Sequence, residues 1–126
     1  MEDKSRTVYV LEDDDAVRGS LEMSLRARGY EVVGFGSALR FLEKLKEGSG
    51  KSACLVLDIG LPTLNGFDVL RKLALSGVQL PTIVTSGKGE LCEEQAKHHK
   101  SIVACLEKPF DIRELWHNLD EVFSRS

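Results

Sequence analysis

Three acids, one hydroxyl residue and one lysine each follow a short apolar run in this 126-residue sequence. An apolar run that stops at a polar residue is typical of a buried strand that ends at the edge of a sheet. Carboxylate, hydroxyl and ammonium groups are also the side chains that bind cations, donate hydrogen bonds and neutralise anions. The five residues are Glu12, Asp13, Asp58, Ser86 and Lys108.

The three acids predict a metal ion if they meet in one place. Two carboxylates about 4 Å apart repel each other by roughly 4 kcal/mol at an effective dielectric constant of about 20, so three together need a cation. Carboxylate oxygens suit Mg²⁺, which keeps several waters and leaves positions open for phosphate oxygens. Phosphoryl chemistry is therefore the first expectation from these residue types.

The elements that must position these residues alternate along the chain. Apolar runs of four or five residues predict five strands, and helical periodicity predicts a helix after each of them. The first helix is expected to be capped by Asp15 and ended by Gly29. The fourth helix, expected over residues 90–100, has the weakest amphipathic pattern. The expected strands cover residues 7–11, 30–33, 53–57, 81–84 and 102–106.

This alternation predicts an α/β fold in which one parallel sheet carries helices on both faces. In open sheets of this kind, ligands bind beyond the carboxyl ends of the strands. Because the five polar residues all follow strands, we expect them to gather at one edge of the sheet. No internal repeat, low-complexity stretch or linker divides the sequence, so residues 1–126 are expected to form a single domain.

The segments around these residues are similar to the receiver domain of bacterial two-component response regulators. The resemblance covers residues 7–123 and rests on the acidic pair 12–13, the loop 58–66, the pair 86–87 and the segment Glu107-Lys108-Pro109-Phe110. It implies a flavodoxin-like, doubly wound sheet of five parallel strands in the order 2-1-3-4-5, with five helices. It also implies a signalling domain that assists only its own phosphorylation and dephosphorylation, rather than an enzyme.

The resemblance implies roles in phosphoryl transfer for three residues. Asp58 would accept a phosphoryl group from a phosphohistidine on a sensor histidine kinase or a histidine phosphotransfer protein. Lys108 would pair with a phosphoryl oxygen, helped by a cis peptide bond before Pro109. Ser86 would donate its hydroxyl to the phosphoryl group and, by shifting inward, change the distal face of the domain. A loose transition state for phosphoryl transfer needs this positioning and counter-charge more than covalent machinery.

The resemblance also implies a Mg²⁺ site that shares Asp58 with the phosphoryl group. Asp13, Asp58 and the backbone carbonyl of Gly60 would hold the ion directly. Glu12 would act through a metal-bound water.

Two other functions stay open. Residues 13–17 follow a strand and resemble the nucleophile motif of haloacid-dehalogenase-type phosphatases, with Asp13 as nucleophile, although this leaves Asp58 unexplained. Alternatively, the fold serves as a docking module whose signal does not depend on phosphate. Cys105 stands where the family usually has an aromatic residue that turns inward, and residues 90–101 lack the family's usual glycine-alanine step.

Composition narrows the class of protein. Seventeen Lys and Arg against 20 Asp and Glu give a net charge of −3, which argues against direct contact with nucleic acid. The apolar runs are far shorter than the roughly 20 residues of a membrane span, and no secretory signal begins the chain, so a cytoplasmic protein is expected. The three cysteines have no disulfide or zinc spacing and are expected to be buried or idle thiols. Because the last expected helix ends near Ser126, the signal would pass to a downstream protein target or to an output domain outside this chain.

Overall fold

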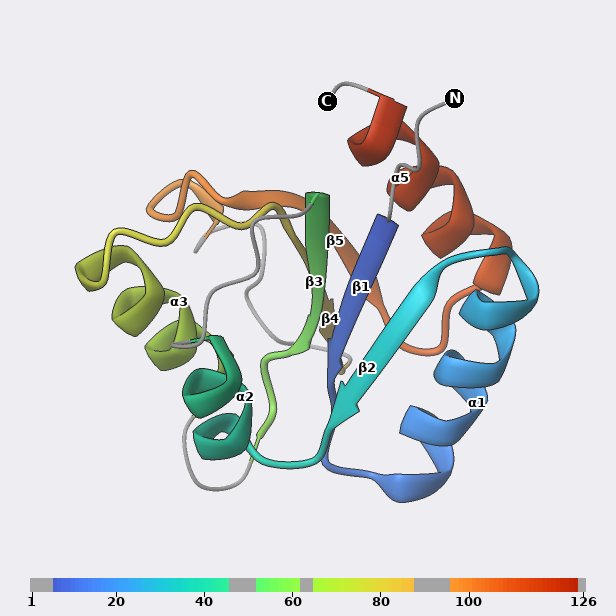
Figure 1. Ribbon diagram of the computed structural model, residues 1–126, viewed down its shortest axis with the longest axis horizontal. Coiled ribbons are helices and arrows are strands. Elements are labelled where there is room, and N and C mark those ends of the chain that lie inside the picture. The colour runs from blue at the N-terminus through green and yellow to red at the C-terminus, as the bar shows by residue number, and fades with distance from the viewer. Residues whose placement is uncertain (1–5, 46–51, 62–64, 88–95, 125–126) are drawn as a thin grey trace.

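Five parallel strands form a single sheet in the computed structural model of the chain, which describes residues 6–45, 52–61, 65–87 and 96–124 (Figure 1). Their order across the sheet is β2-β1-β3-β4-β5, which confirms the expected fold. Every strand begins and ends within two residues of its predicted range. The strands are β1 (Arg6–Leu11), β2 (Glu31–Phe35), β3 (Ser52–Asp58), β4 (Thr82–Ser86) and β5 (Ile102–Glu107).

Helices cover both faces of the sheet (Figure 1). On one face lie α1 (Asp15–Ala27) and α5 (Ile112–Ser124). On the other face lie α2 (Ala38–Leu45) and α3 (Gly66–Leu75). The remaining expected helix, over residues 90–100, falls largely outside the described residues and stays a prediction.

Strand β1 shows why the central strands appear in the sequence as unbroken apolar runs. Val8 and Val10 belong to the core beneath α1 and α5, whereas Tyr9 and Leu11 belong to the core beneath α2 and α3. Successive side chains of a strand point to opposite faces, so a strand that is covered on both faces needs an apolar residue at every position.

The N-terminal cap of α1 is Asp14, so the prediction of Asp15 was wrong. Asp14 has extended backbone angles, with φ −77° and ψ 117°, and its Oδ1 accepts a hydrogen bond from the Val17 amide at 3.0 Å. Asp15 is the first helical residue and pairs with Arg18 instead. Consecutive Asp residues are equally good caps by type, and only the backbone conformation separates them.

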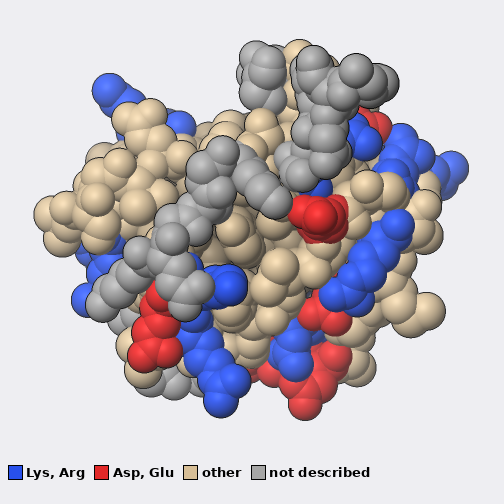
Figure 2. All heavy atoms as spheres, viewed as in Figure 1, with Lys and Arg blue, Asp and Glu red and all other residues tan. Residues whose placement is uncertain are grey.

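Charged side chains of both signs are interspersed over the described surface in the view of Figure 2. This distribution agrees with the small net charge of −3. None of the helices within the described residues is long and apolar enough to cross a lipid bilayer.

The register of the sheet brings the ends of the central strands level with one another. Leu11 of β1 lies opposite Leu57 of β3, and Asp58 lies opposite Thr85 of β4. Polar residues that end or follow these strands therefore share one edge of the sheet, which we term the carboxyl edge.

Candidate functional site

The three acids meet at the carboxyl edge. Glu12 directly follows β1, and Asp58 is the last residue of β3. Together with Asp13 they offer three carboxylate oxygens, one from each residue, that all lie within 4.8 Å of one another. Glu12 and Asp58 are buried, with 3% and 7% of their surface exposed, whereas Asp13 is exposed. Solvent therefore reaches the cluster at Asp13.

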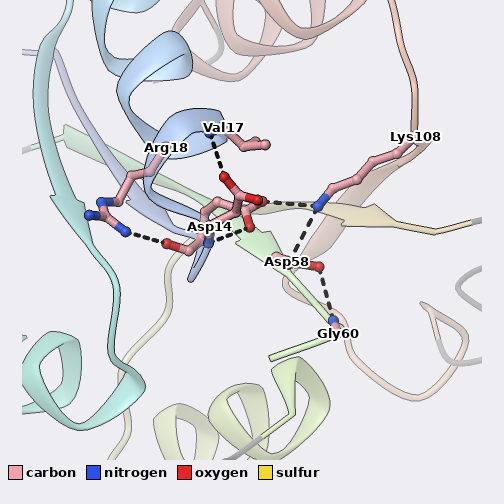
Figure 3. A network of polar contacts seen from close by, with 7 residues as sticks. Asp14, Val17, Arg18, Asp58, Gly60 and Lys108 are labelled. Atoms are coloured by element: carbon pink, nitrogen blue, oxygen red, sulfur yellow. Dashed lines mark hydrogen bonds and ion pairs between the residues drawn. The ribbon is translucent and has the colours of Figure 1, made fainter. Parts of the chain in front are cut away.

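Lys108 reaches the same cluster from the loop after β5 (Figure 3). Its Nζ lies 2.9 Å from Glu12 Oε1 and 3.4 Å from Asp58 Oδ2. The Lys108 amide donates to the Ser86 carbonyl at 2.7 Å, and the peptide bond to Pro109 is cis, as expected. Both the backbone and the ammonium group of Lys108 are thus held in place.

Ser86 and Gly60 also lie at the carboxyl edge. Ser86 is the last residue of β4, is buried, and follows Thr85, the partner of Asp58 in the sheet. The Gly60 amide donates to Asp58 Oδ1 at 2.9 Å, which orients the Asp58 carboxylate (Figure 3). The structure therefore places every site residue predicted from the sequence at one edge of the sheet.

The loop that follows Asp58 ends in a glycine for a steric reason. Gly66 begins α3, and its amide donates to the Ile59 carbonyl at 3.2 Å. A Cβ atom at Gly66 would lie 2.7 Å from Ile59 Cα, which is closer than real Cβ atoms approach. The close return of the chain beside Asp58 thus requires glycine at this position.

Burial has the largest influence on the pKa values of Glu12 and Lys108 in the cluster. Burial raises the pKa of Glu12 and repulsion by Asp58 adds to this rise, although hydrogen bonds from Lys108 and the Asp14 amide act in the opposite direction. Burial by itself lowers the pKa of Lys108, but the contacts with Glu12 and Asp58 raise it overall, so the ammonium group stays charged. One ammonium group among three carboxylates leaves an excess of negative charge.

This arrangement is compatible with a divalent metal ion. Three carboxylate oxygens within 4.8 Å form a hard ligand set, and an ion such as Mg²⁺ completes its coordination with water. A cation would also relieve the repulsion that a single lysine leaves unbalanced.

Two residues that support Glu12 were not predicted from the sequence. The Asp14 amide donates to Glu12 Oε2 at 3.1 Å, and Arg18 Nη1 donates to the Glu12 carbonyl at 2.8 Å. The only sequence signal for Arg18 is its spacing of three residues from Asp15, which is common on helix surfaces.

The cysteines depart from expectation at one position. Cys54 is free and fully buried, and burial raises the pKa of its thiol to about 12. Cys105 is disulfide-bonded, so the expectation of a buried or idle thiol was wrong there. Spacing along the chain does not show which cysteines approach each other in the fold. Cys105 packs against Val84 and against Ile59, the residue that follows Asp58.

Comparison with known proteins identifies the family of this chain. The sequence pattern described as the response regulator receiver domain matches residues 8–120. The chain belongs to this family. As a receiver domain it is a signalling domain, a phosphoacceptor of two-component systems, and the comparisons support neither the phosphatase nor the docking alternative.

Individual relatives of the receiver domain agree with this assignment. The response regulator protein TmoT of Ectopseudomonas mendocina is 40% identical over 91 residues, which cover 72% of this chain and 40% of TmoT. The response regulator protein TodT of Pseudomonas putida is 35% identical over 115 residues, which cover 91% of this chain and 50% of TodT. The crystal structure of FixJ-N matches with a TM-score of 0.82 and 28% identity, covering 97% of this chain and 94% of that one. The chain thus spans about half the length, or less, of these two curated relatives.

Proposed function

We propose that Asp58 is the phosphoacceptor of this receiver domain. The observation that carries the proposal is the position of Lys108, whose ammonium group lies 3.4 Å from Asp58 Oδ2. A cation beside the attacking oxygen supplies the counter-charge that an incoming phosphoryl group needs. Ser86, at the end of the adjacent strand, would donate its hydroxyl to a second phosphoryl oxygen.

The proposed step is a displacement at phosphorus. A carboxylate oxygen of Asp58 forms a bond to the phosphorus of a phosphohistidine on the partner protein. The phosphorus–nitrogen bond breaks, and its electron pair stays with the imidazole nitrogen. The product is an acyl phosphate on Asp58, and the Lys108 ammonium group would neutralise part of its negative charge. The hydrogen bond from the Gly60 amide to Asp58 Oδ1 leaves the other carboxylate oxygen, next to Lys108, as the attacking atom.

Mg²⁺ is the cofactor that we propose for this site. Asp13, Asp58 and the Gly60 carbonyl would hold the ion, and Glu12 would act through a bound water. When bound, the ion neutralises charge on the phosphoryl oxygens. The support for this proposal is the close approach of three carboxylates, two of them buried, with one lysine to balance them.

The proposed partners follow from the family. A sensor histidine kinase or a histidine phosphotransfer protein would supply the phosphoryl group. A downstream protein target, or an output domain outside this chain, would respond to the change at the distal face. Residues 1–126 would form one receiver domain with its core over about 7–123. It would act in the cytoplasm without direct contact with nucleic acid or membrane, and it would not turn over a separate substrate.

Phosphorylation by a small donor tests the assignment of Asp58. Incubation with acetyl phosphate and Mg²⁺, followed by mapping of the modified carboxylate by mass spectrometry, is expected to label Asp58 in the wild-type protein and no residue in Asp58→Asn. Asp120→Asn is a matched control, because it makes the same chemical change on α5, and it is expected to be labelled normally. Label on Asp13 would support the phosphatase instead, and label on neither acid would favour the docking module.

A further inference from the structure

We propose that Arg18 is a positioning residue for the metal-binding acids and that it acts through the peptide group between Glu12 and Asp13. The inference rests on the proposed function, because it concerns how the same Mg²⁺ site is held. Arg18 lies on α1 and contacts the main chain of Glu12. It would therefore orient the acids without binding the ion itself.

Two hydrogen bonds hold the Arg18 guanidinium group, and Figure 3 draws one of them. Nη1 donates to the Glu12 carbonyl at 2.8 Å, and Nη2 donates to Asp15 Oδ1 at 2.6 Å. Only 21% of the Arg18 side chain is exposed, so it is not a freely moving surface cation. Asp15, three residues earlier in the same helix, thus contacts the same guanidinium group that donates to Glu12.

The same stretch of chain is fixed from its other side. The Glu12 amide donates to the Phe35 carbonyl at the end of β2 at 3.0 Å. Because the Glu12 carbonyl and the Asp13 amide belong to one planar peptide group, holding the oxygen fixes the direction in which the chain enters Asp13. One guanidinium group therefore sets the orientation of two acids relative to each other.

A glycine after β2 leaves room for this contact. A Cβ atom at Gly36 would lie 2.9 Å from Arg18 Nη1, the far end of a flexible side chain, so the guanidinium group would have to shift. Alanine at this position would displace the guanidinium group and so disturb its hydrogen bond with the Glu12 carbonyl. Gly36 therefore offers a second way to disturb the contact without altering Arg18.

Charge and geometry affect metal affinity in opposite directions at Arg18. Loss of its positive charge favours a bound cation, whereas release of the peptide group weakens the binding site. Arg18→Lys keeps the charge but lacks the planar fork that makes both hydrogen bonds, so it isolates the geometric effect. Arg26→Lys is the matched control, because Arg26 Nη2, from the last turn of α1, donates to the Val32 carbonyl of β2 at 3.0 Å.

Titration calorimetry with Mg²⁺ alone, together with urea denaturation in metal-free buffer, tests the proposal. Arg18→Lys is expected to raise the dissociation constant for Mg²⁺ about tenfold, the lower end of the effect seen when a group that orients metal ligands is changed. Arg26→Lys is expected to keep the wild-type dissociation constant. Both variants are expected to lower the urea midpoint by similar amounts, since each loses one contact between α1 and a strand or its end.

Gly36→Ala provides an independent test of the same contact. It is expected to weaken Mg²⁺ binding as Arg18→Lys does. The double variant is expected to bind no more weakly than either single one, because both substitutions break one interaction. Additive losses would overturn the claim that Gly36 and Arg18 act through that contact.

The other outcomes separate this inference from the proposed function. Wild-type affinity in Arg18→Lys would overturn the positioning role while leaving the Mg²⁺ site intact. An equal loss of affinity in Arg26→Lys would also overturn it, because a general loosening of α1 would then explain both results. No binding of Mg²⁺ by the wild-type protein would overturn the metal site of the proposed function itself.

Discussion

Each edge of the sheet carries a charged cluster, and carboxylates outnumber cations in only one of the two. At the opposite edge, where the strands begin and which we term the amino edge, Asp120 of α5 accepts two hydrogen bonds. One comes from the Tyr30 hydroxyl and the other from Arg28 Nη2 at 2.8 Å. The Arg28 guanidinium lies 4.8 Å from the centre of the Trp116 ring, and that of Arg6 lies 4.9 Å from the centre of the Tyr30 ring. In this amino-edge cluster two guanidinium groups surround one carboxylate, whereas at the carboxyl edge one ammonium group faces three carboxylates.

The pKa values of two carboxyl groups show the consequence. Burial acts to raise the pKa of Asp120, but the hydrogen bonds from Tyr30 and Arg28 outweigh it and the pKa is lowered. Burial raises the pKa of Glu12, and repulsion by Asp58 raises it further. The amino-edge cluster therefore stabilises the folded chain by itself, while the carboxyl edge retains repulsion that a bound cation would remove.

The largest effect is expected when the amino-edge cluster loses its only acid. Asp120→Asn keeps the shape of the side chain and an acceptor for Tyr30 but removes the charge. We expect the free energy of unfolding at pH 7 to fall by about 1–2 kcal/mol. Most of this loss should come from the hydrogen bond of buried Tyr30, which would then have a neutral acceptor instead of a charged one. The pair with Arg28 is half exposed and should contribute less. Urea denaturation measures the change. Glu121→Gln, at the next and exposed position, is the control and should shift stability by less than about 0.5 kcal/mol.

Mg²⁺ is expected to bind at the carboxyl edge alone and to stabilise the fold from there. At ten times its dissociation constant, the ion should stabilise the wild-type fold by about 1.4 kcal/mol and raise the thermal midpoint. Asp120→Asn should show the same increase from its lower starting point, and Asp58→Asn should show much less. A midpoint that does not respond to millimolar Mg²⁺ in the wild-type protein would contradict the contrast between the edges.

Replacement of aspartate by asparagine is expected to have the opposite effect on stability at the carboxyl edge. Asp58→Asn removes one of three like charges, leaves the Lys108 contact with Glu12, and keeps an acceptor for the Gly60 amide. In buffer with EDTA we expect the free energy of unfolding to rise by about 1 kcal/mol. A loss of stability comparable to that of Asp120→Asn, measured under identical conditions, would show that repulsion between the acids does not destabilise the carboxyl edge.

The smallest expected effect is a difference in how Glu12 and Asp120 make the stability of the fold depend on pH. The raised pKa of Glu12 means that the folded state takes up its proton more readily, so this group adds stability as the pH falls toward the ordinary value of 4.5. The lowered pKa of Asp120 means that its contribution is present above the ordinary value of 3.8 and is lost below it. Urea titrations between pH 7 and pH 3 in metal-free buffer should therefore show a flatter acid limb for Asp120→Asn. Glu12→Gln should instead lose the gain in stability above pH 4.5, and identical pH profiles for both variants would contradict the comparison.

The strands could be predicted because their signal is local. Strand β1 is covered on both faces, so the apolar run 7–11 matches its buried length almost to the residue. The positions of Asp58 and Lys108 after such runs were equally readable. Asp14 as the cap of α1 and Arg18 as a support for Glu12 were not, because both depend on backbone conformation around residues of similar type.

The residues of this chain and their periodicity determined the elements, their alternation and the set of polar groups at strand ends. Tertiary structure decided that these groups meet, that Lys108 lies between Glu12 and Asp58, and that Arg18 contacts the peptide between the first two acids. Periodicity is a property of neighbouring residues and is visible in a linear text. Distances between residues far apart in the chain depend instead on strand register and packing, which only the folded sheet establishes.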